Sequence, residues 1–268
     1  MIRASEYVKP STLEEAYQLC QKRSSVAAGG MMWLKMENIN KQRIVDLSGL
    51  GLEGIQENEE EFCIGAMTTL RMLELHEGLN QRFNGIFREC TRHIVGVQFR
   101  NGATVGGSVF GRFGFSDILT ALMALDAAVE LYQGGILPLD EFISRPRSVK
   151  DRDILVRIRI KKDGRQAAYG SLRRTKTDFP LVACCVSKTK EGWTFSAGAR
   201  PAAARRIFLP GKEQKMTEEE RRALACQAAE AFSYGTNYLG SQEYRKYTAG
   251  VLFRRLMEEI ESGEETEE

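Results

Sequence analysis

Two glycine pairs carry the clearest chemical signal in this sequence. The first lies in residues 26–33, which have the sequence VAAGGMMW, and the second in residues 103–108, ATVGGS. Each pair follows a run that can form a strand, and no Cβ atom covers the backbone amides at the glycines. Successive bare N–H groups can bind an anion such as a phosphate. Asp117 follows the second pair, and its carboxylate could accept hydrogen bonds from hydroxyl groups. We therefore expect two loops that together hold a diphosphate.

Other residue types give little support for further chemistry. The two histidines, His76 and His93, have no potential metal ligand three or four residues downstream, and the six cysteines form no C-x-x-C pair. Residues 49–54, GLGLEG, match the glycine spacing of a dinucleotide fingerprint. The acidic residues that follow lack the apolar stripe of the helix that this motif requires. We expect a surface loop there, no catalytic side chain and no metal site.

The composition limits the class of protein. The chain has 268 residues, of which 43% are hydrophobic, enough for one large domain or two modest ones. Its 38 basic and 36 acidic residues leave a net charge of +2, which gives no sign of a nucleic-acid or membrane partner. No apolar stretch is long enough to cross a bilayer, and the first residues do not resemble a signal peptide. Together with the scattered cysteines, this predicts a cytoplasmic protein.

The hydrophobic pattern predicts strands and helices without a regular βαβ repeat, which is typical of an α+β fold. Strands are expected at residues 5–8, 25–28, 43–47, 61–67, 128–132, 153–160, 181–188 and 193–197. Helices are expected at residues 13–20, 69–76, 79–93, 117–125 and 241–260, and one more begins with a capping box at Thr217. The pattern changes near residues 161–165, so we place a domain boundary there, between residues 1–162 and 163–268.

Several segments together resemble one family, the FAD-binding (medium) subunits of molybdenum hydroxylases of the xanthine dehydrogenase and carbon monoxide dehydrogenase type. Residues 26–33 resemble the family's A-G-G-T-D-L segment, and residues 100–108, RNGATVGGS, resemble R-N-x-A-T-I-G-G-N. Residues 116–127, SDILTALMALDA, are similar to G-D-x-x-P-A-L-L-A-L-D-A. Weaker matches are CIGAMTT at residues 63–69 and SQEYRKY at residues 241–247.

The resemblance implies a fold and a cofactor. Residues 1–162 would form a PCMH-type FAD-binding domain of two subdomains, with non-covalent FAD extended between them. Residues 163–268 would form a small C-terminal domain of the carbon monoxide dehydrogenase flavoprotein type, with a three-stranded antiparallel sheet and helices. The implied FAD contacts are Ala27, Ala28, Gly29, Gly30, Met31, Met32, Trp33, Ile94, Thr104, Val105, Gly106, Gly107, Ser108, Asp117 and Leu155.

The resemblance also implies a role for each group of contacts. Backbone amides of residues 27–33 and 104–108 would bind the diphosphate. Ile94 would pack near the isoalloxazine, Asp117 would reach the adenosine ribose, and Leu155 would pack against the flavin or the adenine.

This sequence departs from the family pattern at four places, one of which is Ser108, a tolerable polar replacement for the family's Asn. Met31 and Met32 replace Thr-Asp, so that only backbone hydrogen bonds remain there. Gly170 stands where many relatives carry a lysine near the flavin, and a missing cation would lower the flavin's reduction potential. Residues 110–115, FGRFGF, replace a small, polar stretch, and these aromatic rings either shield the adenine end or only pack.

The function implied by the resemblance is that of a flavoprotein oxidoreductase subunit. FAD would take electrons from a [2Fe–2S] small subunit and pass them to NAD or another acceptor. The substrate, a purine or an aldehyde, would be oxidised at a molybdopterin large subunit. Two alternatives stay open: a free-standing FAD-dependent oxidoreductase of the same fold, and a flavin-free scaffold subunit.

Overall fold

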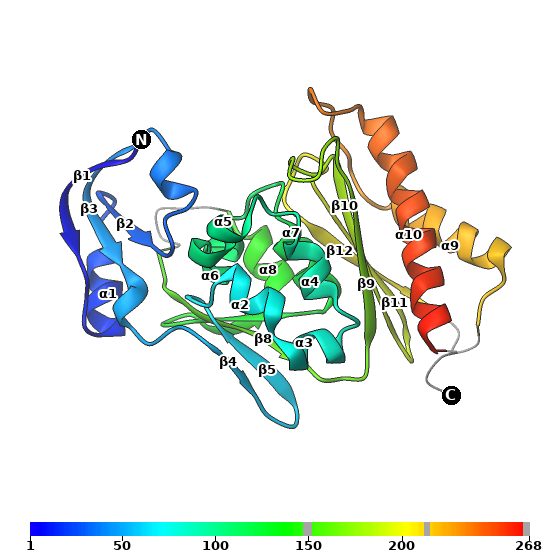
Figure 1. Cartoon of the computed structure of the whole chain (residues 1–268), viewed down its shortest axis with the longest axis horizontal. Coiled ribbons are helices and arrows are strands. Elements are labelled where there is room, and N and C mark those ends of the chain that lie inside the picture. Colours follow the sequence, from blue (N-terminus) through cyan, green and yellow to red (C-terminus); the bar gives the residue numbers. More distant parts are fainter. Residues whose placement is uncertain (147–151, 212–214, 265–268) are drawn as a thin grey trace.

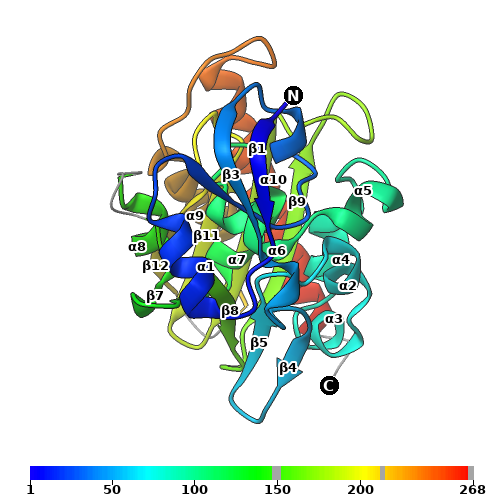
Figure 2. The ribbon, with the colours of Figure 1, turned by 90° about the vertical axis from the view of Figure 1, so that its left-hand side faces the viewer.

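Three sheets follow one another along the molecule (Figure 1). The computed structural model describes residues 1–146, 152–211 and 215–264. The N-terminal sheet lies at one end, a five-stranded sheet with most of the helices lies in the middle, and a four-stranded sheet lies toward the other end. Seen from the left of Figure 1, the N-terminal sheet stands in front and α10 lies behind (Figure 2).

The N-terminal sheet places the first glycine pair. Its parallel strands β1 (Arg3–Val8), β3 (Asn40–Asp46) and β2 (Ser25–Ala28) lie in that order, and α1 (Leu13–Cys20) packs against β2 and β3. The predicted strand at residues 25–28 has these same bounds. Because Gly29 directly follows β2, the glycine pair lies at the carboxyl end of a strand, where ligands commonly bind in parallel sheets.

The central sheet is antiparallel and has the strand order β4-β5-β8-β6-β7. Its strands are β4 (Ile55–Glu57), β5 (Glu61–Gly65), β6 (Ala128–Leu131), β7 (Gly135–Pro138) and β8 (Leu155–Lys161). The helices around it are α2 (Leu70–Leu75), α3 (Glu77–Arg82), α4 (Ile86–Thr91), α5 (Val97–Gly102), α6 (Val105–Phe110), α7 (Asp117–Ala124) and α8 (Leu139–Ser144). All eight residues of α7 are buried, because this helix lies between the central unit and the C-terminal sheet.

The C-terminal sheet has four antiparallel strands, not the three expected. Their order is β12-β11-β10-β9, with bounds β9 (Gln166–Leu172), β10 (Val182–Thr189), β11 (Gly192–Gly198) and β12 (Arg205–Pro210). The sequence pattern identified the two inner strands and missed the two outer ones. Helix α10 (Gln242–Glu264) covers one face of this sheet and packs on α9 (Glu218–Glu230), while α7 packs on β10 and β11 (Figure 1).

One further difference from the predicted elements has a local cause, and the expected absence of a helix after GLGLEG agrees with the structure. The helix expected over residues 79–93 is divided into α3 and α4, because Asn84 and Gly85 between them have φ angles of 51° and 72°. Residues 47–49 form a short 3-10 helix, and β4 starts soon after Gly54, so no helix opens at the GLGLEG segment. The α+β class itself is confirmed. In the described ranges, no helix combines the length and apolarity needed to span a bilayer.

Candidate cofactor-binding site

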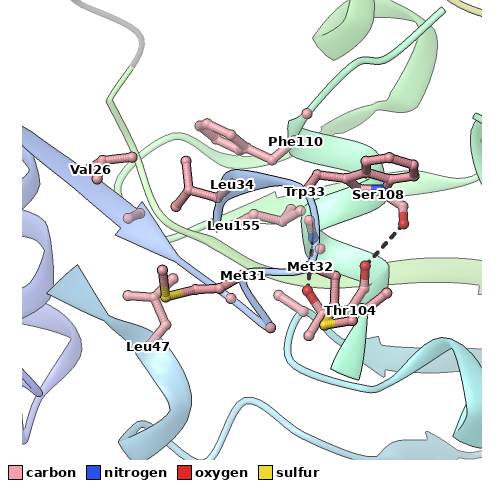
Figure 3. Close-up of a pocket in the computed structure, with 18 of the residues that line it drawn as sticks. Val26, Met31, Met32, Trp33, Leu34, Leu47, Thr104, Ser108, Phe110 and Leu155 are labelled. Carbon is pink, nitrogen blue, oxygen red and sulfur yellow. Dashed lines mark hydrogen bonds between the residues drawn. The ribbon is translucent and has the colours of Figure 1, made fainter. Parts of the chain in front are cut away.

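A cavity of about 420 Å³ lies between the two glycine loops. Figure 3 shows Met31 and Leu47 on one side, Trp33 and Ser108 on the other, and Leu155 between them. The cavity brings together many of the predicted contacts, which are Ala27, Gly29, Gly30, Met31, Met32, Trp33, Thr104, Gly106, Gly107, Ser108 and Leu155. Ala28 and Val105 are buried next to these residues in the chain and do not line it.

The first loop offers backbone donors to this cavity. The amide nitrogens of residues 30–33 donate no hydrogen bond to any other described residue. Met31 has a φ of 57°, a left-handed conformation that is uncommon for a residue with a side chain. A backbone turn through this region can direct successive N–H groups toward one anion. The first loop therefore has backbone donors available, and its binding of a diphosphate stays a prediction.

In the second loop, the backbone amides donate hydrogen bonds to oxygens of the protein itself. Val105 N donates to Thr68 O at 2.9 Å and Gly106 N to Ala66 O at 2.8 Å. Gly107 N donates to Thr104 Oγ1 at 3.1 Å, and Ser108 N donates to Thr104 O at the same distance. Thr104 thus caps α6, and a diphosphate could bind these amides only by replacing bonds to Thr104 or to the backbone. Diphosphate binding by this loop stays a prediction.

The glycines of the two loops allow a close approach between them. A Cβ atom on Gly30 would lie 1.4 Å from the carbonyl oxygen of Gly102, and one on Gly29 would lie 2.7 Å from Thr104 Oγ1. A Cβ on Gly106 would lie 2.6 Å from Ala66 O. Gly107 differs, because it is exposed and a Cβ there would meet only Thr104 Oγ1, at 3.0 Å. The bare backbone at Gly107 thus leaves room at the cavity wall.

Asp117 lies outside this cavity. Its carboxylate pairs with the Arg173 guanidinium at 2.5 Å and accepts a hydrogen bond from the Tyr169 hydroxyl. Burial raises the pKa of Asp117, and the positive charge of Arg173 opposes that change. Tyr169 lies on β9, and Arg173 is the first residue after that strand. The contacts of Asp117 with these two residues therefore join α7 to the C-terminal sheet. The ribose contact of Asp117 stays a prediction, and sequence reasoning missed both of its partners.

A second, small cavity of about 50 Å³ adjoins the first. Its lining includes Ile94, Asp117 and Arg173, and it shares Trp33, Ser108 and Phe113 with the large cavity. The resemblance implied that Ile94 lies near the isoalloxazine and Asp117 near the adenosine ribose. The structure thus brings Ile94 and Asp117 to one cavity, and both roles stay predictions.

His93 also lines the small cavity, although its sequence context gave no reason to select it. Its Nε2 accepts a hydrogen bond from Arg92 Nε at 3.2 Å. Burial lowers the pKa of His93, and the nearby charges of Arg92 and Arg173 lower it further. Its Nδ1 is buried and has no hydrogen-bond partner within the described residues.

The position of Gly170 also differs from expectation. A Cβ on Gly170 would lie 3.4 Å from Leu256 Cδ2, and Leu256 belongs to α10. The neighbouring Tyr169 points the other way, toward Asp117. A side chain at position 170 would therefore face α10, and the cation that does line the small cavity is Arg173.

The large cavity fits a nucleotide cofactor that has a diphosphate at its centre. Unpaired amides and bare glycine backbone form one part of its wall, and aliphatic and aromatic side chains form the rest. These features define a dinucleotide-binding protein of α+β architecture. Residues 3–161 match the family described as the FAD binding domain in molybdopterin dehydrogenase, and the chain belongs to this family. The predicted family and the predicted cofactor, FAD, are both confirmed.

Individual relatives span nearly the whole chain. The chain is 28% identical to the carbon monoxide dehydrogenase medium chain of Afipia carboxidovorans, over 94% of this chain and 95% of that protein. It is 22% identical to the putative xanthine dehydrogenase FAD-binding subunit XdhB of Escherichia coli, over 97% of each. A chain in the structure of carbon monoxide dehydrogenase from Hydrogenophaga pseudoflava has the same fold, with a TM-score of 0.84, 21% identity and coverage of 97% and 98%. The protein is thus an oxidoreductase subunit.

Proposed function

We propose that this chain is the FAD-binding electron-transfer subunit of a multi-subunit molybdenum hydroxylase. Electrons would arrive from a [2Fe–2S] small subunit and leave through FAD to NAD or another acceptor. The substrate, a purine or an aldehyde, would be oxidised at a separate molybdopterin large subunit. Residues 1–162 would hold FAD, and residues 163–268 would form the domain that closes the site. The medium-chain and FAD-subunit relatives support this assignment.

One observation carries the proposal: the amides of residues 30–33 donate to no other described residue, and these residues line a cavity that Gly107 of the second loop also lines. The N–H groups of residues 30–33 would donate to phosphate oxygens, and charge-assisted hydrogen bonds of this kind are stronger than neutral ones. Gly107 would let the phosphate approach the second loop closely. Leu47 and Leu155 would pack against the apolar parts of the cofactor and exclude water from it.

The chain needs no acid–base side chain for this role. Bound FAD supplies the electron acceptance and donation. Asp153, a carboxylate in the cavity wall, accepts hydrogen bonds from the amides of Gln133 and Gly134, the latter at 2.6 Å. It therefore holds a turn in place. Position and burial of the cofactor are what this subunit contributes.

The test starts with the purified full chain and FAD. Flavin absorbance that stays with the protein after desalting is the expected result, and the isolated chain should not be reduced by xanthine or by an aldehyde. Co-expression with a [2Fe–2S] small subunit and a molybdopterin large subunit, if such chains are encoded beside it, should yield a complex in which such a substrate reduces the flavin. A colourless chain after reconstitution would indicate the scaffold alternative. Direct reduction of the isolated chain by the substrate would indicate a free-standing oxidoreductase.

A further inference from the structure

Trp33 lies at the centre of a group of aromatic rings. Its ring centroid is 5.1 Å from that of Phe99, 5.4 Å from that of Phe115 and 5.7 Å from that of Phe179, and Phe113 follows at 6.3 Å. We call these five residues the aromatic cluster. Trp33 belongs to the first glycine loop, Phe99 to α5, Phe113 and Phe115 to the segment before α7, and Phe179 to the loop between β9 and β10. The cluster therefore joins all three units of the fold.

The aromatic cluster stands between the two cavities. Trp33 and Phe113 line both of them, whereas Phe115 and Phe179 line only the small one. Figure 3 shows the Trp33 ring at the edge of the large cavity, beside Ser108. A ligand that extends from the first glycine loop into the small cavity must pass along this ring.

The cluster is more open than the hydrophobic core. Phe62 and Phe83 in the central core are 0% exposed, whereas Phe179 is 42% exposed and Trp33 is only partly buried. Ring-to-ring contacts of this kind are favourable, and a planar ligand ring can replace them with similar contacts. The rings can thus separate at small cost when another planar group enters.

A dinucleotide supplies such a group on either side of its diphosphate. Trp33 is the last of residues 30–33, whose amides donate to no other described residue. Its side chain is therefore attached next to these amides. A phosphate on those amides would bring one end of the cofactor next to the indole. The small cavity beyond it is lined by His93, Arg173 and Phe179, so aromatic and polar side chains surround the space next to the indole.

We propose that the Trp33 side chain is a positioning residue that stacks on one ring system of FAD at the junction of the two cavities. This inference rests on the proposed function. Phe113, Phe115 and Phe179 shift to admit the ring, which then lies against the indole face. If the aromatic cluster only held the three units together, Trp33 would contribute to stability and not to the bound cofactor.

The experiment uses fluorescence, because the chain contains only two tryptophans, Trp33 and Trp193. Trp193 is 1% exposed in the C-terminal sheet, so a Trp193→Phe variant of the full chain leaves Trp33 as the sole tryptophan reporter. ADP and FAD are titrated separately. Quenching of Trp33 emission by ADP identifies the adenine as the stacked ring. Alternatively, the flavin emission of bound FAD is suppressed in the chain that has Trp33 and restored in the Trp33→Leu variant. That result identifies the isoalloxazine as the stacked ring.

Substitutions at two positions separate stacking from packing. Trp33→Leu should weaken FAD binding about tenfold, the loss typical of one ring-stacking contact, and Trp33→Phe should retain most of the affinity. Phe99→Leu is the matched control, because Phe99 contacts the indole yet lines neither cavity. It should lower the urea midpoint of unfolding and leave the dissociation constant of FAD unchanged.

The possible outcomes separate this inference from the proposed function. A Trp33→Leu protein with unchanged FAD affinity and unchanged flavin emission, together with Trp33 emission that is insensitive to ADP, would overturn the stacking role alone. The same conclusion would follow if Phe99→Leu weakened FAD binding as much as Trp33→Leu. If the wild-type chain failed to bind FAD after reconstitution, the proposed function would fall and this inference with it.

Discussion

The two glycine loops have similar sequences and different physical roles. In the first loop, the amides of residues 30–33 donate no hydrogen bond to another described residue, and they border the large cavity. In the second, the amides of residues 105–108 all donate to oxygens of the protein. The first loop has donors available for a ligand, and the second has a fixed conformation against which the first can pack.

The glycines explain how the loops fit together. Gly30 lets the first loop touch the Gly102 carbonyl, and Gly106 lets α6 approach the Ala66 carbonyl, so both positions are required by the chain itself. Gly107 lacks such a neighbour, since a Cβ there would meet only a threonine hydroxyl. In the second pair, Gly106 is therefore a packing residue, whereas Gly107 borders the cavity with no close backbone neighbour.

The largest effect is expected at Asp117, the acid that follows the second loop. Its side chain and that of Arg173 are only 5% and 8% exposed. Asp117→Asn leaves the guanidinium buried without its counter-charge, and we expect the free energy of unfolding to fall by about 3–5 kcal/mol. Urea denaturation measures this loss. The double variant Asp117→Asn with Arg173→Met should recover part of it, whereas a carboxylate that served only the cofactor would leave the stability of the apoprotein unchanged.

Gly30→Ala tests whether the first loop must touch the second. Its Cβ would lie 1.4 Å from a backbone oxygen, so the loops have to separate. We expect a loss of about 2–3 kcal/mol in stability, typical of overpacking, and loss of bound flavin because the amides of residues 30–33 move with the loop. Thermal unfolding and flavin absorbance after desalting measure the two effects. A stable variant with full flavin content would show that the loops do not depend on their contact.

Thr104→Val removes the hydroxyl group that accepts a hydrogen bond from the Gly107 amide. We expect a loss of about 1 kcal/mol from the missing helix cap, measured by urea denaturation. If the first loop supplies most of the phosphate contacts, the FAD dissociation constant should change by less than about threefold, which corresponds to less than about 0.7 kcal/mol. Thr104→Ser keeps the hydroxyl and serves as the control. A much larger change in affinity for the valine variant alone would give the second loop the greater share of binding.

The sequence predicted the local parts of the site and missed those that depend on tertiary packing. Both glycine loops are continuous segments with a recognisable composition, so their role in one cavity could be predicted. The contact of Asp117 with Tyr169 and Arg173 joins residues more than 50 positions apart, and no sequence period reports it. Strand β9 was missed because QAAYGSL consists mostly of small and polar residues without clear alternation. Its place comes from pairing with β10.

Gly107→Ala gives the smallest expected change in stability and the clearest test of whether the diphosphate approaches the second loop at Gly107. Alanine favours a helix by about 1 kcal/mol over glycine, and this gain offsets the 3.0 Å contact with Thr104 Oγ1. The free energy of unfolding should therefore change by less than about 1 kcal/mol. The added methyl group would enter the space left for the phosphate, so the dissociation constant of FAD should rise at least about tenfold, or about 1.4 kcal/mol. Fluorescence titration measures this constant, and an unaltered value in a folded variant would mean that the cofactor touches only the first loop.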